Sequence, residues 1–358
     1  MRLLDRIVQS RVPLLVARGT DVVRLPGPAD FASALVASPL RLVLTDPLTR
    51  VCASLAYAEG DRLGGCLDLV HVPARSLWVE WLDAPRLEAV STALGLGPPA
   101  GAAPPMRAGV YVSADPAGRR GWARTFWGPV DGDGEASLAP LITEFDLDAG
   151  EADVGSIGEV FAGGAARLAA DDPALAGILR CLRFRFDERW ATYYRAECTT
   201  AAARESVLRA SLATVATDLP VLFALCLLLS SRTRLPERRP DLARINRHRR
   251  REGRMPLVDH VELTVPVVSG YAAAEPGGDP RRTPRLHHVR GHLVRRGSQV
   301  FWRVPHLRGR AAFGHLRARS MTLHFESRSR ASPESRPLDS HAAAARRDYA
   351  TSLRGGIP

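Results

Sequence analysis

The sequence predicts an α+β protein, and three features of the chain lead to that prediction. Short apolar runs separated by Gly, Pro and Asp turns fill the first 150 residues, which indicates strands and short helices. Residues 155–230 are richer in Ala and Leu and favour helices. A basic stretch around residue 296 has the pattern of a β-hairpin. We therefore expect an N-terminal mixed antiparallel α+β domain (1–150), a central helical segment (151–231), a small basic α+β module with a β-hairpin (232–326) and a disordered tail (327–358).

The predicted elements of the N-terminal unit are short. Strands or buried segments are expected at Val12–Val16, Leu40–Leu44 and Leu67–Val72, with a short helix at Asp30–Ala37. Gly95–Pro105 is a Pro- and Gly-rich connector. Beyond it, Gly109–Ser113 and Trp122–Trp127 are expected to be strands joined by the turn Asp115-Pro-Ala-Gly.

The central segment is expected to hold helices at Ile178–Ala196 and Ala201–Leu229. Its uncharged part, Leu219–Ser231, has 13 residues and contains Pro220. A transmembrane helix needs about 20 apolar residues, so a buried core helix is the better interpretation. Pro220 then belongs to the first turn of a second helix, with Asp218 as its N-cap.

Composition excludes several kinds of chemistry. The chain has no Lys, so all 49 basic residues are Arg, against 38 acidic residues. A P-loop lysine, a pyridoxal Schiff base and a Ser–Lys dyad are therefore impossible. The five Cys are scattered, and no dinucleotide-binding or P-loop glycine pattern occurs, so we expect a reducing compartment and no cofactor. No apolar signal core precedes the charges at Asp5, Arg6 and Arg11, which predicts a cytoplasmic location.

The charge is unevenly distributed along the chain. Residues 1–180 hold 16 Arg and 22 acidic residues, a net charge of −6, whereas residues 181–358 hold 33 Arg and 16 acidic residues, a net charge of +17. Such asymmetry suggests that the basic half faces a polyanion, or that it is a basic surface kept for solubility.

Residues 281–325 carry the strongest signal, because they contain 11 Arg and six of the ten His but no acidic residue. Two apolar-rich runs, Val289–Arg295 and Val300–Pro305, flank the turn Arg296-Gly-Ser-Gln, which predicts a hairpin. Strand parity then assigns the side chains to faces. His288, Arg290, His292 and Val294 would share one face, and on the second strand Val300, Trp302 and Val304 would oppose Phe301 and Arg303.

Three functions fit this stretch, and the first is nucleic-acid binding, to RNA or DNA. Arg binds phosphates bidentately, and Phe301 or Trp302 would stack on a base. The candidate phosphate ligands are Arg290, Arg295, Arg296, Arg303 and Arg308, supported by His288, His292 and Trp302.

The second function is metal-independent ribonuclease activity. His288, His292 and His306 would supply a general acid and base, and Arg290 and Arg308 would stabilise charge on phosphorus. The third is a metal site on His288, His292 and His306, which we do not expect: two His four residues apart on a strand are about 13 Å apart at ~3.3 Å per residue.

Arg232–Arg254 forms a second basic cluster, with ten Arg in 23 residues. A loop followed by a short helix, Asp241–Glu252, is expected, with Asp241 as its cap. Either this is a solvated basic helix, or it contacts phosphates beside the hairpin through Arg247 and Arg250. Its few apolar residues argue against membrane binding.

The C-terminal part resembles uncharacterised phage- and prophage-associated bacterial proteins. The matching text is Leu257–Leu263, His288–Arg296 and Trp302–Gly309, within about residues 230–325, and Trp78–Trp81 is a weaker match. The resemblance implies a phage or mobile-element origin and a nucleic-acid context, but no activity. It also leaves a further class open, a non-catalytic phage structural or host-interaction protein that contacts its partner through the acidic N-terminal half.

Overall fold

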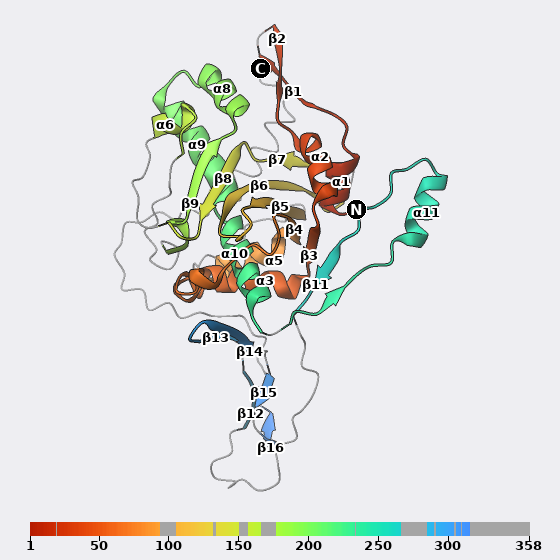
Figure 1. The fold of residues 1–358 in the computed structure, drawn as a ribbon, viewed down its shortest axis with the longest axis vertical. Helices are drawn as coiled ribbons and strands as arrows, with labels where there is room; N and C mark the ends of the chain where they lie inside the picture. The colour runs from red at the N-terminus through yellow and green to blue at the C-terminus, as the bar shows by residue number, and fades with distance from the viewer. Residues whose placement is uncertain are drawn as a thin grey trace.

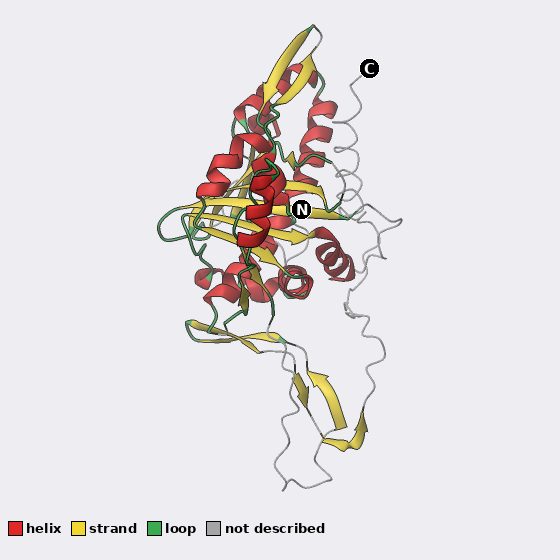
Figure 2. Ribbon diagram, turned by 90° about the vertical axis from the view of Figure 1, so that its right-hand side faces the viewer, coloured by secondary structure: helices red, strands yellow, loops and turns green. Residues whose placement is uncertain are grey.

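A central mixed β-sheet organises the molecule, with helices on both of its faces (Figures 1 and 2). The computed structural model describes residues 1–18, 20–93, 105–131, 134–149, 157–165, 177–232, 234–265, 285–289, 291–303, 306–308 and 310–315. Within them the sheet order is β10 (Glu237–Arg238), β11 (Val261–Leu263), β3 (Leu40–Leu44), β4 (Ser76–Leu82), β5 (Met106–Ala114), β6 (Arg120–Pro129), β8 (Leu141–Asp146) and β9 (Leu182–Phe186), and β7 (Ser137–Leu138) also pairs with β6. The predicted α+β class is confirmed.

The sheet joins segments that are far apart in sequence. Strands β11, β3 and β4 run parallel, and the pairings from β4 through β5, β6 and β8 to β9 are antiparallel. Strand β11 occupies the edge of β3, with Val261 opposite Leu42. One sheet therefore takes strands from all three predicted folded units, and the boundaries predicted at residues 150 and 231 do not divide it.

Strand β4 separates two hydrophobic clusters because its side chains alternate between the faces of the sheet. Leu77, Val79 and Trp81 point into the larger cluster. This cluster is covered by α3 (Asp46–Tyr57), α5 (Asp83–Ala93) and α10 (Asp218–Ser230). Trp78 lies in the smaller cluster, beneath α1 (Leu3–Gln9), the 3₁₀ turn η1 (Pro28–Phe31) and α2 (Ala32–Ala37).

Glu80 shares the α1 face of β4 and caps that helix from a distance in sequence. The first N–H groups of a helix have no acceptor inside the helix, and Arg2 at the N-cap position supplies none from its side chain. The two carboxylate oxygens of Glu80 accept hydrogen bonds from the backbone N–H groups of Leu3 and Leu4, at 3.0 Å each. Arg107 donates to the same carboxylate at 3.1 Å, and Glu80 is fully buried. This carboxylate therefore fixes α1 on the sheet.

The apolar run at residues 219–231 forms the buried core helix predicted for it. Helix α10 is buried from Asp218 to Leu228 and lies against α3. Pro220 belongs to its first turn, as expected, but Asp218 is a helical residue and not the N-cap. Its carboxylate lies 3.8 Å from the buried Arg86 guanidinium, which also donates to Asp83 at 2.8 Å. The negative charge of Asp218 therefore neutralises a buried cation.

The helix predicted at Ile178–Ala196 is wrong in its first half. Residues Leu182–Phe186 form β9, and the alternation of apolar and Arg residues there matches a strand with one buried face. A helix follows, α8 (Glu188–Glu197), with Asp187 accepting from the backbone N–H of Arg189 at 3.2 Å. The segment Ala201–Leu229 forms two helices, α9 (Ala201–Val215) and α10, as the position of Pro220 predicted.

The other predicted elements differ mainly in length. Strands β5 and β6 flank the expected turn, where Gly118 has φ +67° and its Cα approaches the Val72 backbone too closely for a Cβ. Leu67–Leu69 is a 3₁₀ turn, η2. The first predicted strand is β1 (Leu14–Arg18), which pairs with β2 (Asp21–Leu25). The structure also contains the short helices α4 (Gly60–Gly64) and α6 (Ile157–Phe161). The predicted tail and most of the connector 95–105 lie outside the described residues.

In the described part of the chain, no helix combines the length and the apolar character that crossing a membrane requires.

We predict that Glu80→Ala lowers the free energy of unfolding by about 3–5 kcal/mol, because it leaves Arg107 and two helix N–H groups without their acceptor. Glu80→Gln keeps an acceptor oxygen and should cost less. Urea titration measures both. The control is Glu88→Ala, which removes an exposed partner of Arg50 and should cost about 0–1 kcal/mol. Equal effects of Glu80→Ala and Glu88→Ala on stability would contradict the capping role.

Candidate nucleic-acid interface

The predicted hairpin is present, although it begins later than expected. Strands β13 (His292–Arg296) and β14 (Gln299–Arg303) pair antiparallel around the turn Gly297-Ser298. Gly297 has φ +60°, and none of the described residues other than Gly has a positive φ. A two-residue turn with a positive φ only at its first position is typical of type II′, which requires Gly there.

One face of the hairpin is packed against the body of the protein. Register places Leu293 opposite Trp302 and Arg295 opposite Val300, and paired residues share a face. Trp302 is only 5% exposed and belongs with Leu293 and Val300 to the larger hydrophobic cluster, where β14 contacts α10. The Trp302 ring, predicted to support base stacking, is therefore a core side chain.

The Arg295 side chain also contacts the body of the protein. Its guanidinium forms a two-pronged ion pair with the Asp68 carboxylate, at 3.0 and 2.8 Å, and donates to the Gly65 carbonyl. The hydrogen bond to Asp68 raises the pKa of Arg295 further. This cation, predicted to contact phosphates, therefore holds the hairpin against η2.

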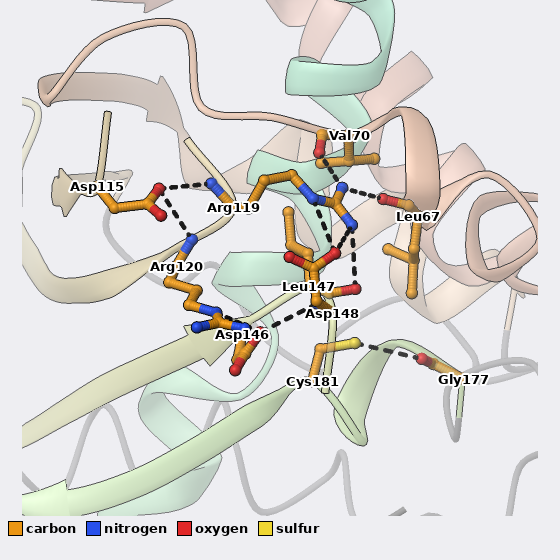
Figure 3. A network of polar contacts seen from close by, with 10 residues as sticks. All are labelled: Leu67, Val70, Asp115, Arg119, Arg120, Asp146, Leu147, Asp148, Gly177 and Cys181. Atoms are coloured by element: carbon orange, nitrogen blue, oxygen red, sulfur yellow. Dashed lines mark hydrogen bonds and ion pairs between the residues drawn. The ribbon is translucent and has the colours of Figure 1, made fainter. Parts of the chain in front are cut away.

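A second arginine fixes the turn on which the hairpin rests (Figure 3). Arg119 donates from Nη1 to the carbonyls of Leu67 and Val70, at 2.7 and 2.6 Å, and pairs with Asp148. The hydrogen bond from Arg119 and its positive charge lower the pKa of Asp148. Arg119 therefore ties the turn that carries Asp68 to the ends of β6 and β8, through contacts that do not involve the hairpin.

The opposite face of the hairpin carries its accessible cations. His292, Val294, Arg296, Phe301 and Arg303 share this face by register. Arg296 and Arg303 are exposed, and neither has a carboxylate partner among the described residues. The Arg232 guanidinium lies 5.8 Å from the centre of the Phe301 ring. This face combines two outward cations with a partly buried aromatic ring.

The three histidines predicted to form a catalytic group belong to two separate strand pairings. β12 (Arg285–Val289) pairs with β15 (His306–Arg308) and β16 (Arg310–His315), whereas His292 begins β13. Register places His306 opposite Val289 and His288 opposite Leu307, and successive strand positions alternate between faces. Arg290 lies outside the described residues, as do the side chains of His288, His306 and Arg308. Register therefore pairs neither His288 nor His306 with another of the three histidines, and no described pairing joins their strands to β13.

The second basic cluster forms a helix with a strongly basic outer side. Helix α11 (Ala243–Arg251) has Leu242 and not the predicted Asp241 at its N-cap position. The Asp241 side chain, one residue earlier, accepts from the backbone N–H of Ala243 at 3.0 Å. Arg244, Arg247 and Arg251 lie at i, i+3 and i+7, hence on one side of the helix. All three are exposed, as is Arg250 beside them, and none has a carboxylate partner in the part of the chain that the structure describes.

A buried amide fixes the inner side of α11. Asn246 is 7% exposed; it donates to the Leu257 carbonyl at 3.0 Å and accepts from the Leu257 N–H at 2.7 Å. One side chain thereby satisfies both backbone groups of Leu257, as a neighbouring strand would. Sequence reasoning missed this residue, although a lone Asn within an arginine run was the available signal.

Helix α1 holds the segment that follows α11. The Asp5 carboxylate accepts from the backbone N–H of Val258 at 2.8 Å, and burial raises the pKa of Asp5. Glu262 on β11 pairs with Arg2 and Arg238. Burial raises the pKa of Glu262, but the Arg238 hydrogen bond and the Arg2 charge outweigh it and leave this pKa below the ordinary value.

The two basic surfaces are separate. Helix α11 projects from the side of the molecule near the N-terminus, whereas β13 and β14 lie below α10 and α3 (Figure 1). The expectation that the basic helix lies beside the hairpin is therefore wrong, because α11 is anchored on α1 and the hairpin on η2.

Within the described residues, no group of His, Cys, Asp and Glu side chains is arranged to hold a metal ion. No protein-family model, curated protein or solved structure matches the chain.

We predict that Glu262→Gln destabilises the protein by about 1.5–3 kcal/mol at neutral pH, since charged hydrogen bonds to two arginines are weakened. A carboxyl whose pKa is lowered by folding contributes stability above its unfolded pKa and loses it as pH falls through the folded pKa. The difference between wild type and variant should therefore shrink as pH drops below the ordinary value of 4.5. Urea titrations across pH test this, with the exposed Glu237→Gln as control. A difference independent of pH would contradict the ion-pair role.

Proposed function

We propose that this protein binds nucleic acid through its phosphates and that the outer side of α11 is the main contact. The observation that carries the proposal is the row of Arg244, Arg247 and Arg251, exposed and without a carboxylate partner among the described residues. Arg is suited to this contact because its planar guanidinium binds phosphate bidentately.

The dimensions of α11 support a phosphate contact. From Arg244 to Arg251 the helix rises by about 10 Å at ~1.5 Å per residue. One strand of a duplex presents about three phosphates over that length, at ~3.4 Å per phosphate. Asn246 holds the opposite side of the helix against Leu257, so the three guanidinium groups project from a fixed support.

The outer face of the hairpin is the second contact in this proposal. Arg296 and Arg303 are exposed on it, and Phe301 supplies an aromatic ring for a base. Arg290 and Arg308 remain proposed contacts. A phage or mobile-element origin, which the sequence resemblance implies, fits this function, and the five free, buried cysteines fit a cytoplasmic location.

Two alternatives give different results in solution. A metal-independent ribonuclease would cleave RNA in the presence of EDTA, and His292→Ala would abolish cleavage while binding survives. A structural or host-interaction protein would purify with a stoichiometric protein partner bound to its acidic N-terminal half. Co-purifying nucleic acid, without cleavage, supports the proposed function.

We predict that the triple variant Arg244→Gln, Arg247→Gln, Arg251→Gln binds nucleic acid at least tenfold more weakly. The slope of log affinity against log salt should fall by about 2–3 in magnitude, because each neutralised phosphate contributes ~0.9 to it in a duplex and ~0.7 in a single strand. Fluorescence anisotropy with mixed-sequence 20-mers at several salt concentrations measures both quantities.

The matched control for α11 is Arg183→Gln, Arg189→Gln, Arg195→Gln. It removes three exposed cations from β9 and α8, on the opposite side of the molecule from α11 (Figure 1). It should change the affinity and the salt slope much less. Equal effects of the two triple variants would show that net charge, and not the face of α11, determines binding.

We predict that Arg296→Gln, Arg303→Gln lowers the salt slope by about 1–2, since two cations that neutralise phosphates are removed. The comparison variant is Arg295→Gln, which removes the ion pair with the exposed Asp68 and should alter stability by about 0–1 kcal/mol. An unchanged slope in Arg296→Gln, Arg303→Gln would remove the hairpin from the interface.

A further inference from the structure

An open groove of about 610 Å³ lies where α1 ends and the segment after α11 begins. Its lining comes from two segments that are far apart in sequence: Met1, Gln9 and Arg11 from the first, and Arg249, Gly253, Arg254 and Met255 from the second. The groove therefore borders the proposed phosphate-binding face of α11 without being part of it. Ligand pockets for small molecules have about this volume.

Among the described residues, three guanidinium groups and no carboxylate line this groove. Arg249 is held in place, because it donates to the Met255 carbonyl at 2.8 Å and to Gln9 Oε1 at 3.2 Å. Arg254 pairs with Glu252, outside the lining, at 3.4 Å. Arg11 lies over Met255, with Nη2 3.8 Å from its Sδ atom. The polar half of the groove therefore carries positive charge.

Gln9 adds a donor that lacks an acceptor. Its Nε2 atom is buried and has no hydrogen-bond partner in the described part of the chain, while its Oε1 atom accepts from Arg249. A buried amide N–H without an acceptor costs free energy that a ligand oxygen or ring nitrogen would recover. Gln9 is therefore a residue of the groove lining that carries a buried donor without an acceptor among the described residues.

Two thioether side chains make the rest of the groove apolar. Met1 and Met255 contribute flexible, polarisable surface, which packs well against flat rings of different shapes. A bare phosphate would not use this surface. A nucleotide would, because it joins a phosphate to an apolar, hydrogen-bonding base.

We propose that this groove takes one nucleotide of a single strand, its phosphate beside Arg11 and Arg254 and its base against Met1 and Met255. The inference rests on the proposed function and makes it more specific. In a duplex the bases are stacked and paired, so no base can enter the groove unless its nucleotide is flipped out of the stack at a cost in free energy. A single strand can turn one base into the groove while its neighbouring phosphates follow α11.

The test compares single-stranded and duplex 20-mers of the same sequence at one salt concentration. The single strand should bind at least tenfold more tightly to the wild type. Arg11→Gln, Arg254→Gln should remove most of that preference and leave duplex binding within about twofold. Both positions are exposed, so the variant should fold. Its matched partner, Arg244→Gln, Arg247→Gln, should weaken the binding of both nucleic acids.

A second measurement probes the base. Adenosine 5′-monophosphate should displace the single strand from the wild type at concentrations where inorganic phosphate does not. Met255→Ser should abolish that difference, and Met255→Leu should retain it.

Two results separate the inference from the function on which it rests. If Arg11→Gln, Arg254→Gln weakens single-strand and duplex binding equally, the groove contributes charge only and the inference is overturned, although nucleic-acid binding stands. If neither nucleic acid binds the wild type, the proposed function itself has failed. Equal displacement by phosphate and by the nucleotide also overturns the inference.

Discussion

The buried carboxylate of Glu80 is the contact on which the basic surface near α11 depends. It caps α1 from the central strand β4, and α1 in turn provides the anchor for the segment after α11. Arg2 reaches Glu262, Asp5 accepts from Val258, and Gln9 accepts from Arg249. A helix of seven residues is too short to be stable alone. The position of the exposed arginines on α11 therefore depends on the buried carboxylate of Glu80 in the central sheet.

In a chain without lysine, arginine has two separate uses. Arg119, Arg6 and Arg41 each donate to two or more backbone carbonyls, which a planar guanidinium with five N–H groups can do from one position. Others, such as Arg247 and Arg296, are exposed and have no carboxylate partner among the described residues. The net charge of +11 therefore does not locate a binding face, because many of the cations that contribute to it connect parts of the fold.

Local patterns predicted the local elements well. The β5–β6 pair, the hairpin turn at Gly297, the core helix at Leu219 and the basic helix that follows Asp241 all depend on residues close together in sequence. The predictions are wrong where contacts with residues distant in sequence determine the local structure. Residues 182–186 form strand β9 because they pair with β8. Trp302 is buried in the hydrophobic cluster that includes α10, and Arg295 forms its ion pair with Asp68. The role of Asn246 likewise depends on where Leu257 lies, which spacing alone does not reveal.

The distance between α11 and the outer face of the hairpin has a consequence for ligand length. Two weak sites on one body act together only when a single ligand reaches both, and binding at the first then raises the effective concentration at the second. A short oligonucleotide occupies one site and binds with the affinity of that site alone. A strand long enough to follow the surface from α11, near the N-terminus, to β13 and β14, below α10 (Figure 1), gains avidity from both. If both faces bind nucleic acid as proposed, this geometry makes the affinity depend on the length of the strand as well as on its charge.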